Sequence, residues 1–206
     1  GLPYADVAAR VEASIANDVV GLRPVSDTPI PALPIAIWAN DPAGRRSDTW
    51  HYAIECAKGG DRYSVDAETH SVIAGADGIP ELVLRTGPAV GSSVPPNIRL
   101  LDIGTGLTDS EVARQFDTGI SSGDLVGFGG ELTLGQGTAL DLGCSPRFTA
   151  AQSAGFENLI GQRRICFLYS TVSASPGSPT NAPSGSSGSV AVCVEIVAIR
   201  IMDVTI

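Results

Sequence analysis

The sequence predicts an α+β fold in which a mostly antiparallel sheet dominates and about three helices lie at its periphery. The 206 residues are 43% hydrophobic and include 24 glycines and 14 prolines, an ordinary globular composition that is rich in turns. Short apolar runs bounded by turn residues outnumber helical patterns and do not alternate regularly with helices, which favours a meander over βαβ units. We therefore expect a single domain over residues 1–206.

The first predicted element is a leading helix within residues 1–20. Val7, Val11 and Ile15 recur every four residues within residues 4–18, the spacing of an amphipathic helix. Gly21 is expected to end it.

Short strands are predicted to follow this helix. Residues 35–38 form an apolar run after four prolines, which confine a strand to the edge of a sheet or to its first positions. Four more strands are predicted at residues 50–55, 62–64, 71–73 and 81–85.

Two capping boxes predict the remaining helices. In such a box a hydroxyl and an amide or carboxylate satisfy backbone donors at the helix start. The predicted boxes pair Thr108 with Glu111 and Thr149 with Gln152. We expect helices over residues 109–116 and 150–160.

The last third of the chain predicts two strands joined by a flexible loop. Residues 162–171 alternate, with Ile165, Phe167 and Tyr169 on one face and Cys166 and Leu168 on the other. Residues 173–189 are rich in Ser, Pro and Gly, so we expect a flexible loop. Residues 190–206 are apolar on both faces over most of their length, as in a central strand.

Charge and hydropathy exclude two classes of partner. The formal net charge is −9, and Lys58 is the single lysine among 13 basic residues, so nucleic acid is not an expected partner. The longest apolar run, residues 190–201, is interrupted by Glu195 and Arg200 and is shorter than the roughly 20 residues that a membrane helix needs.

The chain begins at Gly1, and residues 2–20 lack the basic-then-apolar layout of a signal peptide. We expect a removed targeting or anchoring segment upstream; a fragment cut from a longer chain fits the same observation.

Asp102, Gly104 and Gly106 resemble the motif with which class I methyltransferases bind S-adenosylmethionine, between a strand and a helix. Thr108 stands in place of the third glycine, and the doubly wound pattern expected downstream does not follow. We favour a turn followed by a helix cap and keep the methyltransferase-like enzyme as an alternative.

Gly119, Ser121 and Gly123 match the G-x-S-x-G pattern of a nucleophile elbow. A helix precedes this serine, however, and both histidines, His51 and His70, lie upstream of it, so the context is reversed. We interpret the motif as a loop, His51 as a half-buried strand residue and His70 as a turn residue.

Four acidic residues could surround a cation such as calcium, but no calcium-binding loop motif is present. They are Asp61, Asp66, Glu68 and Asp77. Solvated turns are the favoured interpretation. We therefore predict no catalytic, cofactor-binding or metal-binding residues, and no enzyme.

The four cysteines form no CxxC pair and have no histidine at zinc-ligand spacing. If the last two strands form an in-register hairpin, Cys166 and Cys193 lie nearly opposite, and a disulfide would contribute about 3 kcal/mol. Cys56 and Cys144 would then be the second pair. Reduced, buried thiols remain the alternative.

The order of elements in the second half of the chain resembles the ectodomain of tight-adherence (Tad) pilus-assembly proteins of the TadG-like kind. The matching stretches are residues 97–104, 119–124, 135–137, 157–161, 164–169 and 192–204, with residues 31–35 and 75–81 further upstream. Such proteins carry an N-terminal transmembrane helix followed by an Ala-rich helix, and only the latter would correspond to residues 4–18.

This resemblance implies a non-enzymatic, pilin-like structural or assembly role outside the cytoplasmic membrane of a bacterium. The expected location is extracellular or at the cell surface, and the expected partners are pilus or envelope proteins and further copies of the chain. Membrane contact would occur only through a segment absent from this chain. A carbohydrate-binding or surface-binding module that uses exposed loops is a further alternative.

Overall fold

A computed structural model describes residues 4–5, 8–14, 19–26, 28–86, 95–134, 139–174 and 188–205. Its strands are β1 (Tyr4–Ala5), β2 (Ala8–Ser14), β3 (Gly21–Leu22), β4 (Ala32–Trp38), β5 (Tyr63–Val65), β6 (Val72–Ala74), β7 (Glu81–Arg85), β8 (Ile98–Leu101), β9 (Leu132–Thr133), β10 (Leu140–Ser145), β11 (Phe148–Thr149), β12 (Arg163–Ala174) and β13 (Ser189–Thr205). Its helical segments are the α-helices α1 (Asp109–Thr118) and α2 (Ala150–Glu157), the π-helix η1 (His51–Glu55) and the 3-10 turn η2 (Val126–Phe128).

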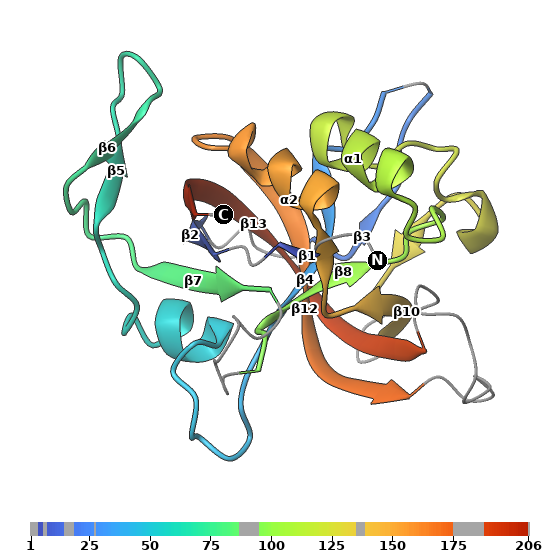
Figure 1. Ribbon diagram of the computed structural model, residues 1–206, viewed down its shortest axis with the longest axis horizontal. Helices are drawn as coiled ribbons and strands as arrows, with labels where there is room; N and C mark the ends of the chain where they lie inside the picture. The colour runs from blue at the N-terminus through green and yellow to red at the C-terminus, as the bar shows by residue number, and fades with distance from the viewer. Residues whose placement is uncertain are drawn as a thin grey trace.

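One seven-stranded sheet organises the chain, in the order β10-β8-β4-β12-β13-β2-β7. All its neighbours are antiparallel except β4 and β12, which run parallel. The fold is therefore sheet-dominated α+β, as predicted. In Figure 1, α1 and α2 lie together on one side of the sheet, while the β5–β6 hairpin projects away from it.

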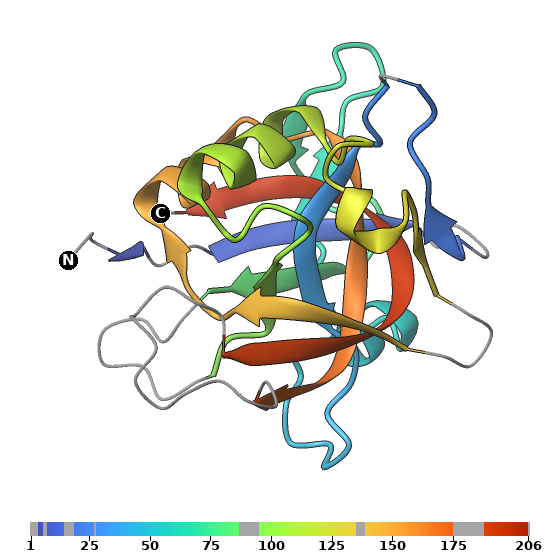
Figure 2. The ribbon, with the colours of Figure 1, turned by 90° about the vertical axis from the view of Figure 1, so that its right-hand side faces the viewer.

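Strand β10 also pairs with β13, which closes five strands into a ring. Figure 2 shows the strands of this ring crossing one another around a common interior. The first half of β13 pairs with β10, and its second half pairs with β2 on the same edge. The other edge of β13 pairs with β12.

Two hydrophobic cores lie on opposite faces of the ring strands. The inner core includes Phe167 and Tyr169, and the outer core, beneath the helices, includes Cys166 and Leu168. The alternation predicted for β12 is therefore confirmed. Because side chains along a strand alternate between faces, successive residues of β12 enter the inner and the outer core in turn.

The predicted leading helix is wrong, because residues 8–14 form strand β2, held between β13 and β7. Ala9 and Val11 are both buried, which is the two-residue period of a strand. Val7 and Ile15, two of the three residues of the helical pattern, lie outside the described residues. The two neighbouring strands supply backbone partners that outweigh local helical preference.

The prolines predicted that the strand at residues 35–38 lies at a sheet edge or carries proline only in its first positions, and the edge alternative is wrong. Strand β4 lies inside the sheet, between β8 and β12, with Pro34 as its third residue. The register against β12 shifts between the pairs Ile165↔Ala32 and Phe167↔Ala36, and Pro34 has no registered partner on either side. A bulge thus accommodates the proline where no backbone N–H is required.

Among the shorter elements, β5, β6 and β7 confirm three predicted strands within one residue at each end. The strand predicted for residues 50–55 is wrong, because this segment forms the π-helix η1, in which Ala53 and Ile54 are buried in the outer core. Over only six residues, the hydrophobic pattern of a strand, which repeats every two residues, cannot be told from that of a helix.

Both predicted capped helices are present, although only one has its capping box. The Thr149 hydroxyl accepts a hydrogen bond from the Gln152 backbone N–H, and the Gln152 side-chain oxygen accepts one from the Thr149 backbone N–H, so this box is confirmed. Thr108 is the N-cap of α1 but makes no side-chain capping bond, and Glu111 instead pairs with Arg114. The first box is therefore wrong.

The hairpin of β12 and β13 is present, but its predicted disulfide is wrong. Tyr169, not Cys166, lies opposite Cys193, and Cys166 lies opposite Val197. Cys166 faces the outer core and Cys193 the inner one, and all four cysteines are free thiols. The loop predicted to be flexible covers residues 173–189, of which residues 175–187 lie outside the described residues and the flanking positions 173, 174 and 189 belong to β12 and β13.

Asn97 covers the outer edge of the sheet at β7. Its side chain accepts from the Arg85 N–H at 2.7 Å and donates to the carbonyls of Val83 and Asp48, each at 2.8 Å. Its own backbone N–H donates to the Arg85 carbonyl. Asn97 is fully buried, so these partners would be left without a hydrogen bond if the amide were removed.

We expect Asn97→Leu to lower the free energy of unfolding by about 3 kcal/mol, because several buried backbone groups lose their partner at once. Urea titration followed by tryptophan fluorescence measures it. Asn40→Leu, at an exposed position, is the matched control and should change stability by less than about 0.5 kcal/mol. Equal stability of the two variants would contradict a structural role for the Asn97 amide.

Candidate functional site

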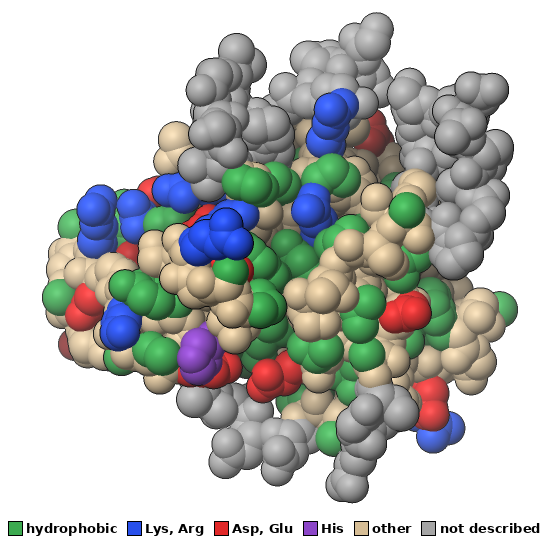
Figure 3. Space-filling view, turned by 90° about the horizontal axis from the view of Figure 1, so that it is seen from below, with side chains coloured by type: hydrophobic (Ala, Val, Ile, Leu, Met, Phe, Trp, Pro, Cys, Tyr) green, Lys and Arg blue, Asp and Glu red, His purple; other side chains and the backbone are tan. Residues whose placement is uncertain are grey.

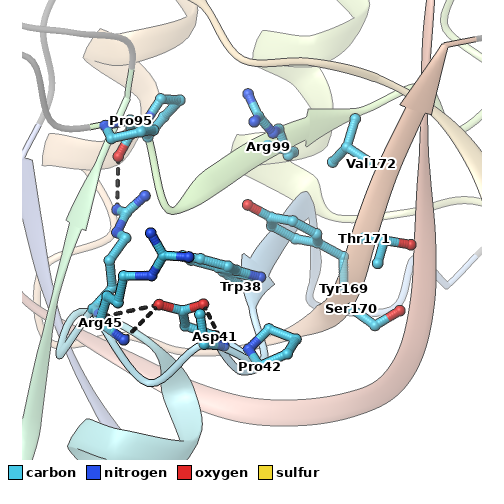
Figure 4. Close-up of a pocket in the computed structure, with 13 residues that line it drawn as sticks. Trp38, Asp41, Pro42, Arg45, Pro95, Arg99, Tyr169, Ser170, Thr171 and Val172 are labelled. Atoms are coloured by element: carbon cyan, nitrogen blue, oxygen red, sulfur yellow. Dashed lines mark hydrogen bonds between the residues drawn. The ribbon is translucent and has the colours of Figure 1, made fainter.

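A cleft of about 570 Å³ opens where β4 ends, β8 begins and β12 continues. Its walls come from three segments that are far apart in the sequence: residues 38–46, residues 95–99 and residues 169–172. Figure 4 shows Trp38, Arg99 and Tyr169 lying around the same space. The mixture of aromatic rings and arginines distinguishes this cleft chemically.

Asp41 shapes the turn that forms one wall. Its carboxylate accepts backbone hydrogen bonds from Ala43, Arg45 and Arg46, at 2.9 to 3.0 Å. These bonds, led by the one from Ala43, lower the pKa of Asp41, so the turn is held by a carboxylate in its charged form at neutral pH. The turn presents two consecutive arginines to the cleft.

Arg46 is fixed in place by three groups. Its guanidinium lies 4.8 Å from the centre of the Trp38 ring and donates two hydrogen bonds to Asp48, at 2.8 and 2.6 Å. It also donates to the Pro95 carbonyl at 2.7 Å, which ties the turn to the opposite wall. The bidentate bond to Asp48 raises the pKa of Arg46, so this cation is permanent and already paired.

Arg99 differs from Arg46 because it forms no ion pair among the described residues. Its guanidinium lies 6.0 Å from the centre of the Tyr169 ring, and its buried Nε has no hydrogen-bond partner. Tyr169 is 4% exposed, and burial raises its pKa to about 12, so the phenol stays neutral beside the cation. Arg99 is thus a cation at the cleft that lacks a counter-ion.

The cleft is locally positive in an otherwise acidic chain. Arg45, Arg46 and Arg99 outnumber the neighbouring Asp41 and Asp48 by one, whereas the chain as a whole carries −9. Figure 3 views the molecule from below, where hydrophobic side chains occupy the centre of the face and Lys and Arg side chains gather to one side. Such a surface suits a ligand that combines an anionic group with an apolar or planar part.

The methyltransferase-like motif builds a turn in this structure. The Asp102 carboxylate accepts from the backbone N–H groups of Thr105 and Gly106, at 3.0 and 2.8 Å. Gly104 has a φ of +71°, and a Cβ there would come within 2.1 Å of the Asp124 carbonyl. Backbone therefore packs where a cofactor would have to approach, an arrangement that favours the turn interpretation.

The G-x-S-x-G serine is also part of a turn. The Ser121 hydroxyl and backbone N–H both donate to the Asp124 carboxylate, at 2.8 and 2.7 Å, and Arg114 forms an ion pair with the same carboxylate. Burial opposes ionisation of Asp124, but these hydrogen bonds and Arg114 together lower its pKa. The residues form a structural anchor between α1 and the segment that follows it.

The acidic residues considered for a cation also close turns. Asp61 accepts from the backbone of Asp77 and Gly78, and Asp66 accepts from the backbone of Glu68 and Thr69. No group of three or more His, Cys, Asp or Glu side chains comes together at ligand spacing in the part of the chain that the structure describes.

The two histidines have separate roles. His70 occupies a turn with a φ of +58°, as predicted. His51 is exposed and belongs to η1, which corrects the half-buried strand position. Its Nδ1 lies 2.6 Å from a Glu55 carboxylate oxygen, and its Nε2 lies 3.6 Å from the Cys56 sulfur.

No motif in the sequence pointed to the cleft. Trp38 was predicted in a strand and Tyr169 on a strand face, but neither was assigned to a site. The consecutive Arg45 and Arg46 after Asp41 were the available local signal. Their meeting with Arg99 and Tyr169 depends on strand pairing between residues more than a hundred positions apart.

No protein-family model matches the chain, and comparison with curated proteins and with solved structures gives no match. Within the described residues, no helix has the length and apolar character required to cross a membrane.

We expect Asp124→Asn to lower the free energy of unfolding at pH 7 by about 2 kcal/mol, because Arg114 and Ser121 lose a buried ionised partner. Folding lowers the pKa of Asp124, so its contribution to stability is present at neutral pH and is lost as the pH falls through the lowered pKa. Urea titrations at pH 7 and pH 3 should show the gap to wild type narrowing. The exposed Asp117→Asn is the control, and a gap independent of pH would contradict this account.

We expect Cys56 to be the one cysteine that a thiol reagent modifies in the native protein, because Cys144, Cys166 and Cys193 are buried. Nε2 of His51 can accept the thiol proton, and the thiolate is the nucleophile, so His51→Ala should slow modification several-fold. Stopped-flow labelling at pH 7 measures the rate, with His70→Ala as control. An unchanged rate in His51→Ala would show that the contact has no chemical consequence.

Proposed function

We propose that this chain is a non-enzymatic binding domain that serves as a structural or assembly component of a bacterial surface apparatus and contacts partner proteins through the cleft. The observation that carries the proposal is the cleft itself, in which Trp38 and Tyr169 flank an arginine that lacks a counter-ion. The resemblance to TadG-like proteins suggests the apparatus, and export to the cell surface is part of the same proposal.

The composition of the cleft is that of a protein-binding hot spot. Trp, Tyr and Arg are the residues that contribute most to protein interfaces, because large rings and a planar cation are desolvated at small entropic cost. The site is also held ready before a ligand arrives. Arg46 is locked against Trp38 by Asp48 and Pro95, so binding does not have to order it.

A carbohydrate-binding module is the second candidate. Ser170 and Thr171 line the cleft beside Tyr169, and a ring next to polar residues can stack on a sugar. An acidic sugar would also satisfy Arg99. Peptides and acidic oligosaccharides must therefore be compared directly in the test.

We expect selection from a displayed random twelve-residue peptide library to yield peptides that require the cleft. Their affinity, measured by fluorescence polarisation, should fall at least tenfold in Arg99→Gln and in Trp38→Ala, since each variant removes a central contact. Arg23→Gln, which changes an arginine that is largely exposed, is the matched control and should bind like wild type. Thermal melts of each variant confirm folding.

Two outcomes would contradict the proposal. Recovery of no peptide that depends on Arg99 and Trp38 would overturn binding of proteins at the cleft. Cleft-dependent binding of oligogalacturonate in place of peptides, measured by calorimetry with the same variants, would establish the carbohydrate module instead. Saturable binding of S-adenosylmethionine that Gly104→Val abolishes would establish the methyltransferase alternative.

A further inference from the structure

Strand β12 continues past the end of its neighbour β4, which leaves one of its edges open among the residues that the structure describes. Tyr169 is the last residue of β12 paired with β4, through Trp38, and the Ala39 N–H donates to the Tyr169 carbonyl at 2.9 Å. Beyond this point, residues 171–174 pair with β13 alone among the residues described. Alternate backbone N–H and C=O groups along this stretch therefore face away from any strand partner.

A bulge marks the place where the open edge begins. The register of β12 against β13 shifts on both sides of Tyr169, and Ser170 is the residue of β12 passed over. Bulges turn a strand away from its neighbours and are frequent next to binding sites. Here the bulge separates the part of β12 that pairs on both edges from the part that pairs on one.

The opposite end of the same sheet is treated differently. Within the described part of the chain no strand pairs with the outer side of β7, but the Asn97 side chain satisfies Arg85 and Val83 there, and the Glu81 carboxylate accepts from the backbone of Arg62 and Tyr63. An open edge invites pairing with another chain, and proteins usually cover it. The contrast singles out residues 171–174 as an edge left open beside a cleft.

The cleft lies along this open edge. Ser170, Thr171 and Val172 form one of its walls, and Pro95 and Pro96 form part of another. Proline has no backbone N–H, so Pro95 and Pro96 cannot donate to a β-ladder across the cleft. The space is therefore bounded on one side by a strand edge and on another by two residues that lack a ladder donor.

Resting on the proposed function, we infer that the partner is an extended polypeptide segment that adds a strand to residues 171–174 and places an acidic side chain against Arg99. The ladder would supply sequence-independent hydrogen bonds, and alternate side chains would enter the cleft beside Trp38 and Tyr169. An acidic residue suits Arg99 because its guanidinium, which hydrogen-bonds to the neutral Tyr169 side chain, forms no ion pair among the described residues and its Nε lacks a hydrogen bond.

A polypeptide accounts for more of these features than a sugar does. An oligosaccharide could meet Arg99 and the rings, but it does not present donors and acceptors at the repeat of a β-ladder. An extended chain can pair with the open edge, whereas a sugar cannot. Its acidic side chain would occupy the locally positive region of a chain whose net charge is −9.

The test uses single N-methyl substitutions along each Arg99-dependent peptide that the library selection yields. Within a run of at least four residues, methylation of every second amide should weaken binding about tenfold, while the intervening amides should change affinity less than threefold, because only alternate N–H groups join a ladder. The pattern is read by fluorescence polarisation against the wild-type chain.

A double-mutant cycle tests the acidic contact. Replacing the acidic residue of the peptide by its amide should cost about tenfold with the wild-type chain and almost nothing with Arg99→Gln. Hydrogen exchange followed by NMR provides an independent readout. Amides within residues 171–174 should gain protection on binding, while those of β7, whose edge is already covered, should not change.

The outcomes separate the two proposals. Arg99-dependent peptides without an alternating methylation pattern would overturn strand addition and leave binding at the cleft intact. Failure to recover any such peptide would overturn both. A concentration-dependent dimer of the chain, detected by sedimentation and dissolved by Arg99→Gln, would identify the occupant as a second copy and overturn the separate partner.

Discussion

Strand β13 is the constraint on which the rest of the structure depends. Over its 17 residues it pairs with β12 on one edge and, on the other, with β10 and then β2. The pairing with β10 closes the five-stranded ring. The pairing with β2 attaches β2 and β7, whose buried side chains enlarge the outer core. A single strand therefore joins both cores, so loss of its pairing would expose the two together.

Stability and the cleft share one network of polar contacts. The Asn97 amide covers the edge of β7 and donates to the Asp48 carbonyl, and the Asp48 carboxylate holds Arg46 against Trp38. The same buried amide thus supports the sheet and anchors the segment that positions the aromatic wall. Arg99 takes no part in this network, and it has no counter-ion among the described residues.

The sequence was most informative where chemistry is local. The box of Thr149 and Gln152 and the alternation of Phe167 and Leu168 depend on neighbours within a few residues, and both are confirmed. The structure places both catalytic-looking motifs in turns for the same reason. Asp102 and Ser121 satisfy backbone or side-chain groups within four residues of themselves, and such bonds form with little help from the rest of the chain.

The sequence by itself determined the fold class, the positions of strands β4 to β7, β12 and β13, two helices and the turn chemistry, because periodicity and capping are properties of short segments. Only the tertiary structure decided that residues 8–14 are a strand, that Pro34 lies inside a sheet, and that Cys166 and Cys193 face different cores. Each of these depends on partners distant in the chain or on a bulge that changes the register. The cleft depends on them too, since its walls meet only when β4, β8 and β12 are paired.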